Sequence, residues 1–168
     1  DGTTRILTLW DQSAIPDVEH NRLPPEGYTE GVLYTRDEIN EALAAGSRQA
    51  GLAIVPQQDI SGHGTAVAAL AAGSQSGVAA QAQLVVVKLG NPLAESSPRT
   101  TQLMRGISYV VNLGVELNMP VVVNLSFGNT YGDHRGESLL ERFIDNASEI
   151  GRTAIIIGSG NEGASNGH

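Results

Sequence analysis

Residues 61–73 read Ser-Gly-His-Gly-Thr-Ala-Val-Ala-Ala-Leu-Ala-Ala-Gly and decide the fold more than any other stretch of the chain. The glycine-flanked His63 opens a run of small apolar residues that predicts a helix. Because this run has no polar face, we expect the helix to be buried. An imidazole at the start of a rigid helix is suited to general-base catalysis, since it exchanges protons near neutral pH.

Apolar strands and helical patterns alternate on both sides of this stretch. Thr35 and Glu38 form a predicted capping box that starts a helix, whereas residues 11–35 carry the proline, glycine and acidic residues of a long surface excursion. Strands are predicted at 5–10, 82–89, 121–126 and 153–157, and further helices at 101–117 and 136–150. This alternation predicts an α/β fold with a mostly parallel sheet and helices on both faces.

The composition is that of an ordinary globular domain. The chain has 168 residues, enough for one domain, and we expect residues 1–168 to belong to a single domain with an insertion-like loop and helix region at about 11–58. The formal net charge of −8 argues against nucleic acid or an anionic membrane as partner. The absence of cysteine excludes disulfides, thiolate metal sites and a cysteine nucleophile.

Two further polar stretches follow predicted strands. Residues 123–128 read Val-Asn-Leu-Ser-Phe-Gly, and residues 158–163 read Gly-Ser-Gly-Asn-Glu-Gly. Taken alone, the first is an ordinary strand exit and the second a tight turn with asparagine in the left-handed region. In a parallel sheet, however, ligand sites lie outside the carboxyl ends of the strands, where both stretches are expected.

Together the three stretches, in this order, resemble the subtilisin-like serine proteases, the subtilases, over about residues 59–165. The resemblance implies part of a three-layer subtilisin-like fold and a serine endopeptidase parent. It implies that His63 is the general base and that Asn161 donates to the oxyanion. It also implies that Ser126, Phe127 and Gly128 hold the substrate strand by main-chain pairing.

The resemblance leaves two catalytic positions unfilled. None of the serines lies in the Gly-Thr-Ser-Met-Ala type of motif that carries the subtilase nucleophile, so we expect the catalytic Ser outside this chain. Trp10-Asp11-Gln12 resembles a stretch that follows the catalytic Asp in clostridial-type subtilases, including the Csp germination proteases. The catalytic Asp is therefore expected upstream, with Asp11 as a weaker alternative and Asp59 as the weakest. A chain without both residues should not cleave peptides.

Other interpretations stay open at the level of sequence. A pseudoprotease of subtilase fold that acts in signalling would carry the same motifs. An unrelated flavodoxin-like or nucleotide-binding domain would need a phosphate-binding glycine loop after the first strand, which residues 10–13 do not supply.

Cofactors, partners and compartment are expectations of the same kind. No cofactor is required. The family allows calcium, but Asp17, Glu19 and Glu30 match no calcium motif, and no metal site is assigned. The expected partner is a peptide or protein substrate, without nucleic acid or membrane, and exposed sheet edges favour self-association of the isolated chain. A bacterial protein that is secreted or associated with the spore or cell envelope is favoured slightly over a cytoplasmic one.

Overall fold

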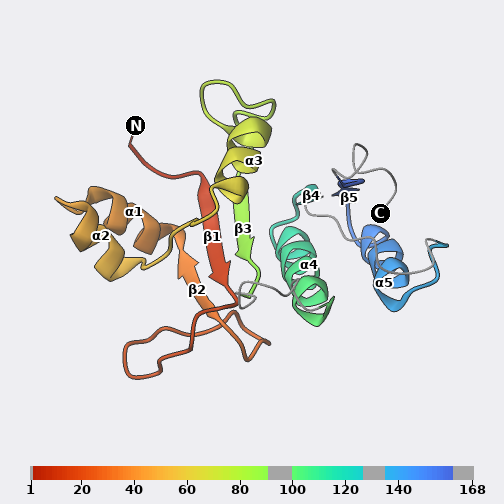
Figure 1. Ribbon diagram of the computed structural model, residues 1–168, viewed down its shortest axis with the longest axis horizontal. Helices are drawn as coiled ribbons and strands as arrows, with labels where there is room; N and C mark the ends of the chain where they lie inside the picture. Colours follow the sequence, from red (N-terminus) through yellow and green to blue (C-terminus); the bar gives the residue numbers. More distant parts are fainter. Residues whose placement is uncertain (1, 91–99, 127–134, 161–168) are drawn as a thin grey trace, which may run out of the picture. The chain divides into compact units, whose positions relative to one another are not determined.

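The structure is a computed structural model that describes residues 2–90, 100–126 and 135–160. The chain divides into two compact units, Asp1–Pro98 and Arg99–His168. Figure 1 shows strands β1, β2 and β3 in the first unit, and β4 and β5 in the second. Helices and parallel strand pairs occur in both units, which confirms the predicted α/β class.

The first unit is built on a three-stranded sheet in the order β2-β1-β3. Strand β1 (Ile6–Asp11) pairs in parallel with β3 (Leu84–Lys88) and antiparallel with β2 (Val32–Thr35). The strands predicted at 5–10 and 82–89 are therefore confirmed, with shifted ends. Strand β2 lies inside the segment 11–35, where the sequence predicts only a surface excursion. Its four residues are too few to show an alternating pattern in the sequence.

Two short helices follow β2. Helix α1 (Arg36–Ala44) begins at the predicted capping box: the Thr35 side chain accepts from the Glu38 backbone, and the Glu38 side chain accepts from the Thr35 backbone. Helix α2 (Arg48–Ile54) is not predicted by the sequence pattern. The buried core here comprises Val32, Tyr34 and Ile39, so α1 and β2 pack together.

Trp10 anchors the segment between β1 and β2. Its side chain is fully buried, and its indole Nε1 donates to the backbone oxygen of Glu30 at 3.0 Å. The Tyr28 ring lies against it in a tilted arrangement, with ring centroids 4.7 Å apart. The excursion is therefore attached to the sheet through an aromatic contact and a hydrogen bond.

Gly31 lies close to the end of β1, and we expect its replacement by alanine to destabilise the first unit. Its φ is +77°, and a Cβ atom would overlap the Asp11 carbonyl oxygen and lie 2.7 Å from Trp10 Nε1. Left-handed strain and overpacking together should lower the free energy of unfolding by about 2–5 kcal/mol. Urea unfolding followed by fluorescence of Trp10, the single tryptophan of the chain, measures the effect.

Gly27 provides the matched control for that substitution. Its φ is +81°, but a Cβ atom there would meet nothing within 4 Å. Gly27→Ala should therefore cost only the left-handed strain, about 1–2 kcal/mol. Equal losses of stability in the two variants would contradict the close packing of Gly31 against β1.

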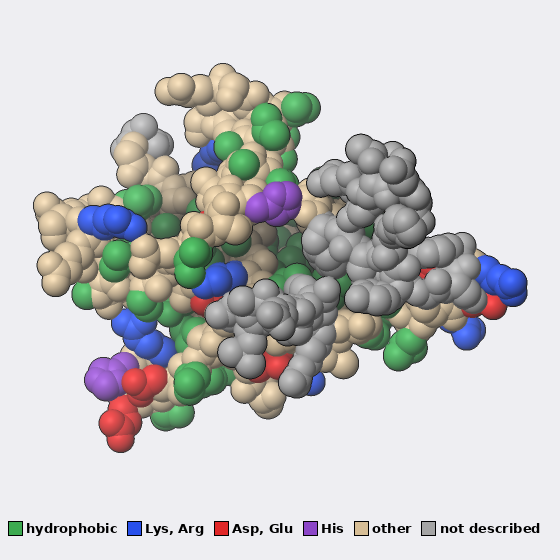
Figure 2. All heavy atoms as spheres, in the orientation of Figure 1, with side chains coloured by type: hydrophobic (Ala, Val, Ile, Leu, Met, Phe, Trp, Pro, Cys, Tyr) green, Lys and Arg blue, Asp and Glu red, His purple; other side chains and the backbone are tan. Residues whose placement is uncertain are grey.

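Helix α3 (His63–Ala72) begins at His63, as predicted, but the prediction that it is buried is wrong for the described structure. Only Ala72 is buried, and Leu70 is 73% exposed. Apolar side chains are visible on the surface around this helix in Figure 2. Burial requires a partner surface as well as an apolar helix, and the described residues supply that surface only at the end of α3.

The second unit pairs two parallel strands with two helices. Strands β4 (Val121–Leu125) and β5 (Thr153–Ile157) are in register, with Leu125 opposite Ile157. Helices α4 (Thr100–Glu116) and α5 (Leu139–Ser148) contact the strands and each other. All four elements are confirmed, but α5 starts three residues later than predicted because Gly136 has a φ of +76° and Ser138 caps the helix.

One face of this two-stranded sheet is open. Val122 is 70% exposed and Ile156 is 54% exposed, whereas Val123 and Leu125 on the other face are buried.

In the described part of the chain, no helix is both long enough and apolar enough to cross a membrane.

Candidate active site

His63 is the first residue of α3, and the turn before it has an unusual backbone. Gly62, the N-cap residue, has a φ of +73° and carries no side chain that could cap the helix. The His63 amide donates to the hydroxyl of Ser61 at 3.2 Å. The His63 side chain itself is exposed.

Asp59 takes over the capping of this helix. Its Oδ1 accepts from the Gly62 amide at 2.9 Å, and its Oδ2 accepts from the amide and the hydroxyl of Thr65, each at 2.8 Å. The hydrogen bonds from Thr65 are the main cause that lowers the pKa of Asp59 from 3.8 to about 2. The sequence spacing suggested Asp59 only as a weak candidate for the catalytic Asp and missed its part in capping.

A second polar cluster lies at the carboxyl ends of β1 and β3. The Asp11 carboxylate is buried and accepts from the amide and hydroxyl of Ser13, at 2.7 and 2.5 Å. Lys88, opposite Asp11 in the register, places its Nζ 3.3 Å from Asp11 Oδ2 and 3.1 Å from Gln57 Oε1. Gln57 precedes residues 61–65, the segment around His63 that we call the histidine turn. This cluster therefore connects the histidine turn to the end of the sheet.

In the second unit, Ser126 lies at the carboxyl end of β4, where the sequence predicts it. Its hydroxyl accepts from the Asn124 side-chain amide at 2.7 Å. The Gly158 amide donates to the Leu125 backbone oxygen at 3.1 Å, so the exits of β4 and β5 stay paired. The predicted substrate strand and the start of the predicted oxyanion loop therefore leave the sheet side by side.

The remaining predicted site residues, Phe127, Gly128 and Asn161, lie outside the described residues. Their roles in substrate and oxyanion binding stay predictions. His63 and Ser126 belong to different units, so the structure describes the surroundings of each but not the distance between them.

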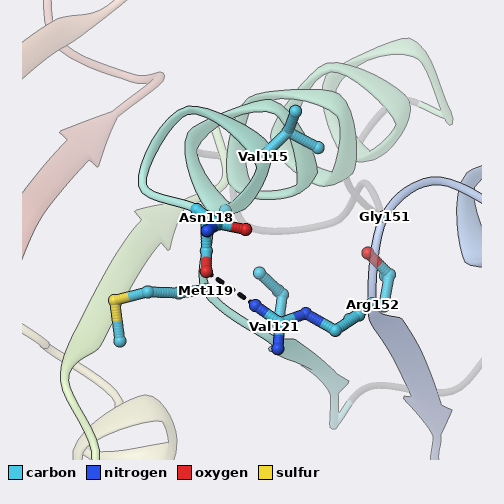
Figure 3. Close-up of a pocket in the computed structure, with 8 residues that line it drawn as sticks. Val115, Asn118, Met119, Val121, Gly151 and Arg152 are labelled. Atoms are coloured by element: carbon cyan, nitrogen blue, oxygen red, sulfur yellow. Dashed lines mark hydrogen bonds between the residues drawn. The ribbon is translucent and has the colours of Figure 1, made fainter.

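The second unit also contains an open pocket of about 310 Å³, which is drawn in Figure 3. It lies at the amino ends of β4 and β5, away from the Ser126 edge, and includes Asn118 and Arg152. The Arg152 guanidinium donates to the Asn118 backbone oxygen at 2.6 Å. This hydrogen bond connects the segment after α4 to the start of β5, so Arg152 stabilises the local structure.

Residues 2–90, 100–126 and 135–160 bring together no group of three or more His, Asp or Glu side chains that could hold a metal ion.

Comparison with known families now defines the class of protein. The model of the subtilase family, Peptidase S8, matches residues 36–168, which include α3, the strand exits and the predicted oxyanion loop. The chain therefore belongs to the subtilase family, as the histidine and strand-exit motifs predict.

Two particular relatives extend this assignment. The chain is similar to the Clostridium perfringens CspB protease, whose solved structure aligns with a TM-score of 0.78 and 34% identity over 98% of this chain and 32% of that one. It is also 35% identical over 108 residues to a subtilisin-like protease of Coccidioides posadasii, over 63% of this chain and 25% of the relative. The chain thus spans about a quarter to a third of the relatives that it matches.

Proposed function

We propose that this chain forms part of a serine endopeptidase, to which it contributes the general base, an oxyanion donor and the substrate strand. The proposal rests mainly on His63, an exposed imidazole at the first residue of α3 within a chain of the subtilase family. Its substrates would be peptides or proteins.

In the proposed reaction, a serine hydroxyl outside this chain attacks the carbonyl carbon of the scissile bond. His63 accepts the hydroxyl proton and returns it to the leaving amine as the carbon–nitrogen bond breaks, which leaves an acyl-enzyme. Water then attacks the ester while His63 accepts a proton from it. His63 returns this proton to the serine oxygen, which releases the acid and the free serine. Asn161 would donate to the oxyanion, a contribution of about 3–4 kcal/mol to the transition state.

Ser126, Phe127 and Gly128 would hold the substrate backbone in extended form beside the strand exits of the second unit. The pairing of β4 with β5 supports this proposal, because it keeps the start of the predicted substrate strand next to Gly158. No cofactor is needed for these steps, since side chains supply the proton transfer and the charge stabilisation.

The catalytic Asp is proposed to lie outside the chain. The surroundings of the two internal alternatives support this. The Asp11 carboxylate is buried and accepts from Ser13 and Lys88. The Asp59 carboxylate accepts from both sides of the histidine turn. Each carboxylate is therefore already engaged in hydrogen bonds that stabilise the local structure, which favours a catalytic Asp elsewhere.

The proposal predicts activity in the complete gene product and none in the isolated 168-residue chain. Both are incubated with a quenched fluorogenic peptide, and hydrolysis is followed by fluorescence. We expect turnover only for the complete product. Turnover by the isolated chain would contradict an external Asp and Ser, and an inert complete product with intact flanking motifs would favour the pseudoprotease alternative.

Exposed apolar surface supports the proposal that more protein covers this chain in its native setting. Leu70 on α3 and Val122 on the open face of β4 are each at least 70% exposed. In isolation these surfaces favour self-association, which light scattering measures. Secretion or association with a spore or cell envelope stays a prediction.

A further inference from the structure

The turn that carries His63 is closed by a single carboxylate. Asp59 accepts from residues on both sides of His63: from Ser61 and Gly62 on Oδ1, and from Thr65 on Oδ2. The hydrogen bond from the Ser61 hydroxyl measures 3.1 Å, and that from the Gly62 amide 2.9 Å. His63 is therefore enclosed between two points of the backbone that share one acceptor.

Backbone geometry explains why a residue outside the helix must do this. An ordinary N-cap residue has an extended backbone, and its side chain accepts from the third helical amide. Here the N-cap is Gly62, in the left-handed region and without a side chain. The third helical amide belongs to Thr65, and Asp59 Oδ2 accepts from it instead. A carboxylate at a helix amino terminus is also favoured by the helix dipole.

Contacts with the sheet also hold the segment that leads into the histidine turn. Gln57, two positions before Asp59, accepts from Lys88 Nζ, and Lys88 is paired with the buried Asp11. Because Lys88 and Asp11 are the final residues of parallel strands, the contacts run from the sheet edge to the histidine turn.

We propose that Asp59 is a positioning residue, which fixes the backbone of the histidine turn and thereby the place of the His63 imidazole. This inference rests on the proposed role of His63 as general base. Asp59 acts on the backbone around His63, in contrast to a triad Asp, which would orient the ring directly.

The first test measures the imidazole itself and does not depend on peptidase activity. Asp59→Ala and Asp17→Ala are compared in complete protein labelled with ¹³C-histidine. Asp17 is a matched control, because it is an aspartate in a turn whose Oδ2 lies 2.7 Å from Nδ1 of His20. We expect Asp59→Ala to shift and broaden the His63 ring resonance and leave that of His20, and Asp17→Ala to do the reverse. An unchanged His63 resonance in Asp59→Ala would overturn the proposal.

The second test separates positioning from substrate binding. Asp59→Ala should lower kcat on a fluorogenic peptide about 10- to 100-fold, with KM within about twofold, because misplacement of a catalytic group affects the chemical step. Asp59→Asn keeps one acceptor oxygen and should fall between Asp59→Ala and the wild type. Rates are corrected for the folded fraction by circular dichroism. A wild-type protein without activity refutes the proposed function, whereas an active protein with unchanged kcat in Asp59→Ala refutes only the role of Asp59.

A pH series supplies the third readout. The pKa of Asp59 is lowered in the folded state from 3.8 to about 2, so its contribution to stability is present above pH 3.8 and is lost as the pH falls towards 2. The difference in Tm between wild type and Asp59→Asn should therefore be largest near neutral pH, shrink below pH 3.8 and approach zero only below about pH 2. A difference that stays constant across this range would overturn the capping role on which the proposal depends.

Discussion

Replacing His63 by alanine is expected to lower kcat of the complete protein about 10,000- to 1,000,000-fold. Without the imidazole, the attacking serine has no group to take its proton, and the leaving amine has none to protonate it. KM should change little, because His63 is proposed to act in the chemical step, whereas Ser126 is proposed to hold the substrate backbone. Steady-state kinetics on a fluorogenic peptide measure both constants.

His20→Ala is the matched control for this loss. His20 is also exposed, and it lies in a turn of the excursion between β1 and β2, where its Nδ1 is 2.7 Å from Asp17 Oδ2. Its replacement should leave kcat within about twofold of wild type, as is usual for surface substitutions away from a site. A similar loss in both variants, or no loss in His63→Ala, would contradict the assignment of His63 as general base.

The largest effect on stability is expected from Trp10→Ala, which should lower the free energy of unfolding of the first unit by about 3–5 kcal/mol. The indole is fully buried, so its removal leaves a cavity under the excursion and deprives the Tyr28 ring of its neighbour. The Glu30 backbone oxygen also loses the hydrogen bond from Nε1. Urea unfolding followed by circular dichroism is suitable, because the variant lacks the only tryptophan.

Trp10→Phe separates the two contributions. Phenylalanine retains a buried ring against Tyr28 but cannot donate to Glu30, so the loss should be clearly smaller than for alanine. Equal losses in the two variants would show that the hydrogen bond, and not the buried ring volume, attaches the excursion to the sheet.

Much of the fold can be predicted from sequence because long apolar runs and capping residues act locally. Strand β5 begins and ends at the predicted residues, and α1 begins at the predicted Thr35 capping box. Strand β2 cannot be predicted in this way. It pairs with β1, and its Val32 and Tyr34 are buried in a cluster with Ile39; the pairing joins segments distant in sequence and leaves little local pattern. The burial of α3 fails as a prediction for the same reason, since it depends on a partner surface.

The candidate site likewise has features that local sequence predicts and features that it does not. The sequence places His63 at a helix start and Ser126 at a strand exit, and the structure confirms both positions. The capping role of Asp59 is not evident from spacing alone, because it depends on the left-handed backbone of Gly62. The bond from Lys88 to Gln57 joins residues 31 positions apart and has no local signal.

The most direct test of the central claim is to locate the nucleophile that His63 activates. The complete protein is treated with a fluorophosphonate, which labels an activated serine, and the labelled peptide is identified by mass spectrometry. We predict one label per molecule, on a serine outside these 168 residues, and its loss in His63→Ala but not in His20→Ala. A label on a serine within this chain, or labelling that persists in His63→Ala, would contradict the account.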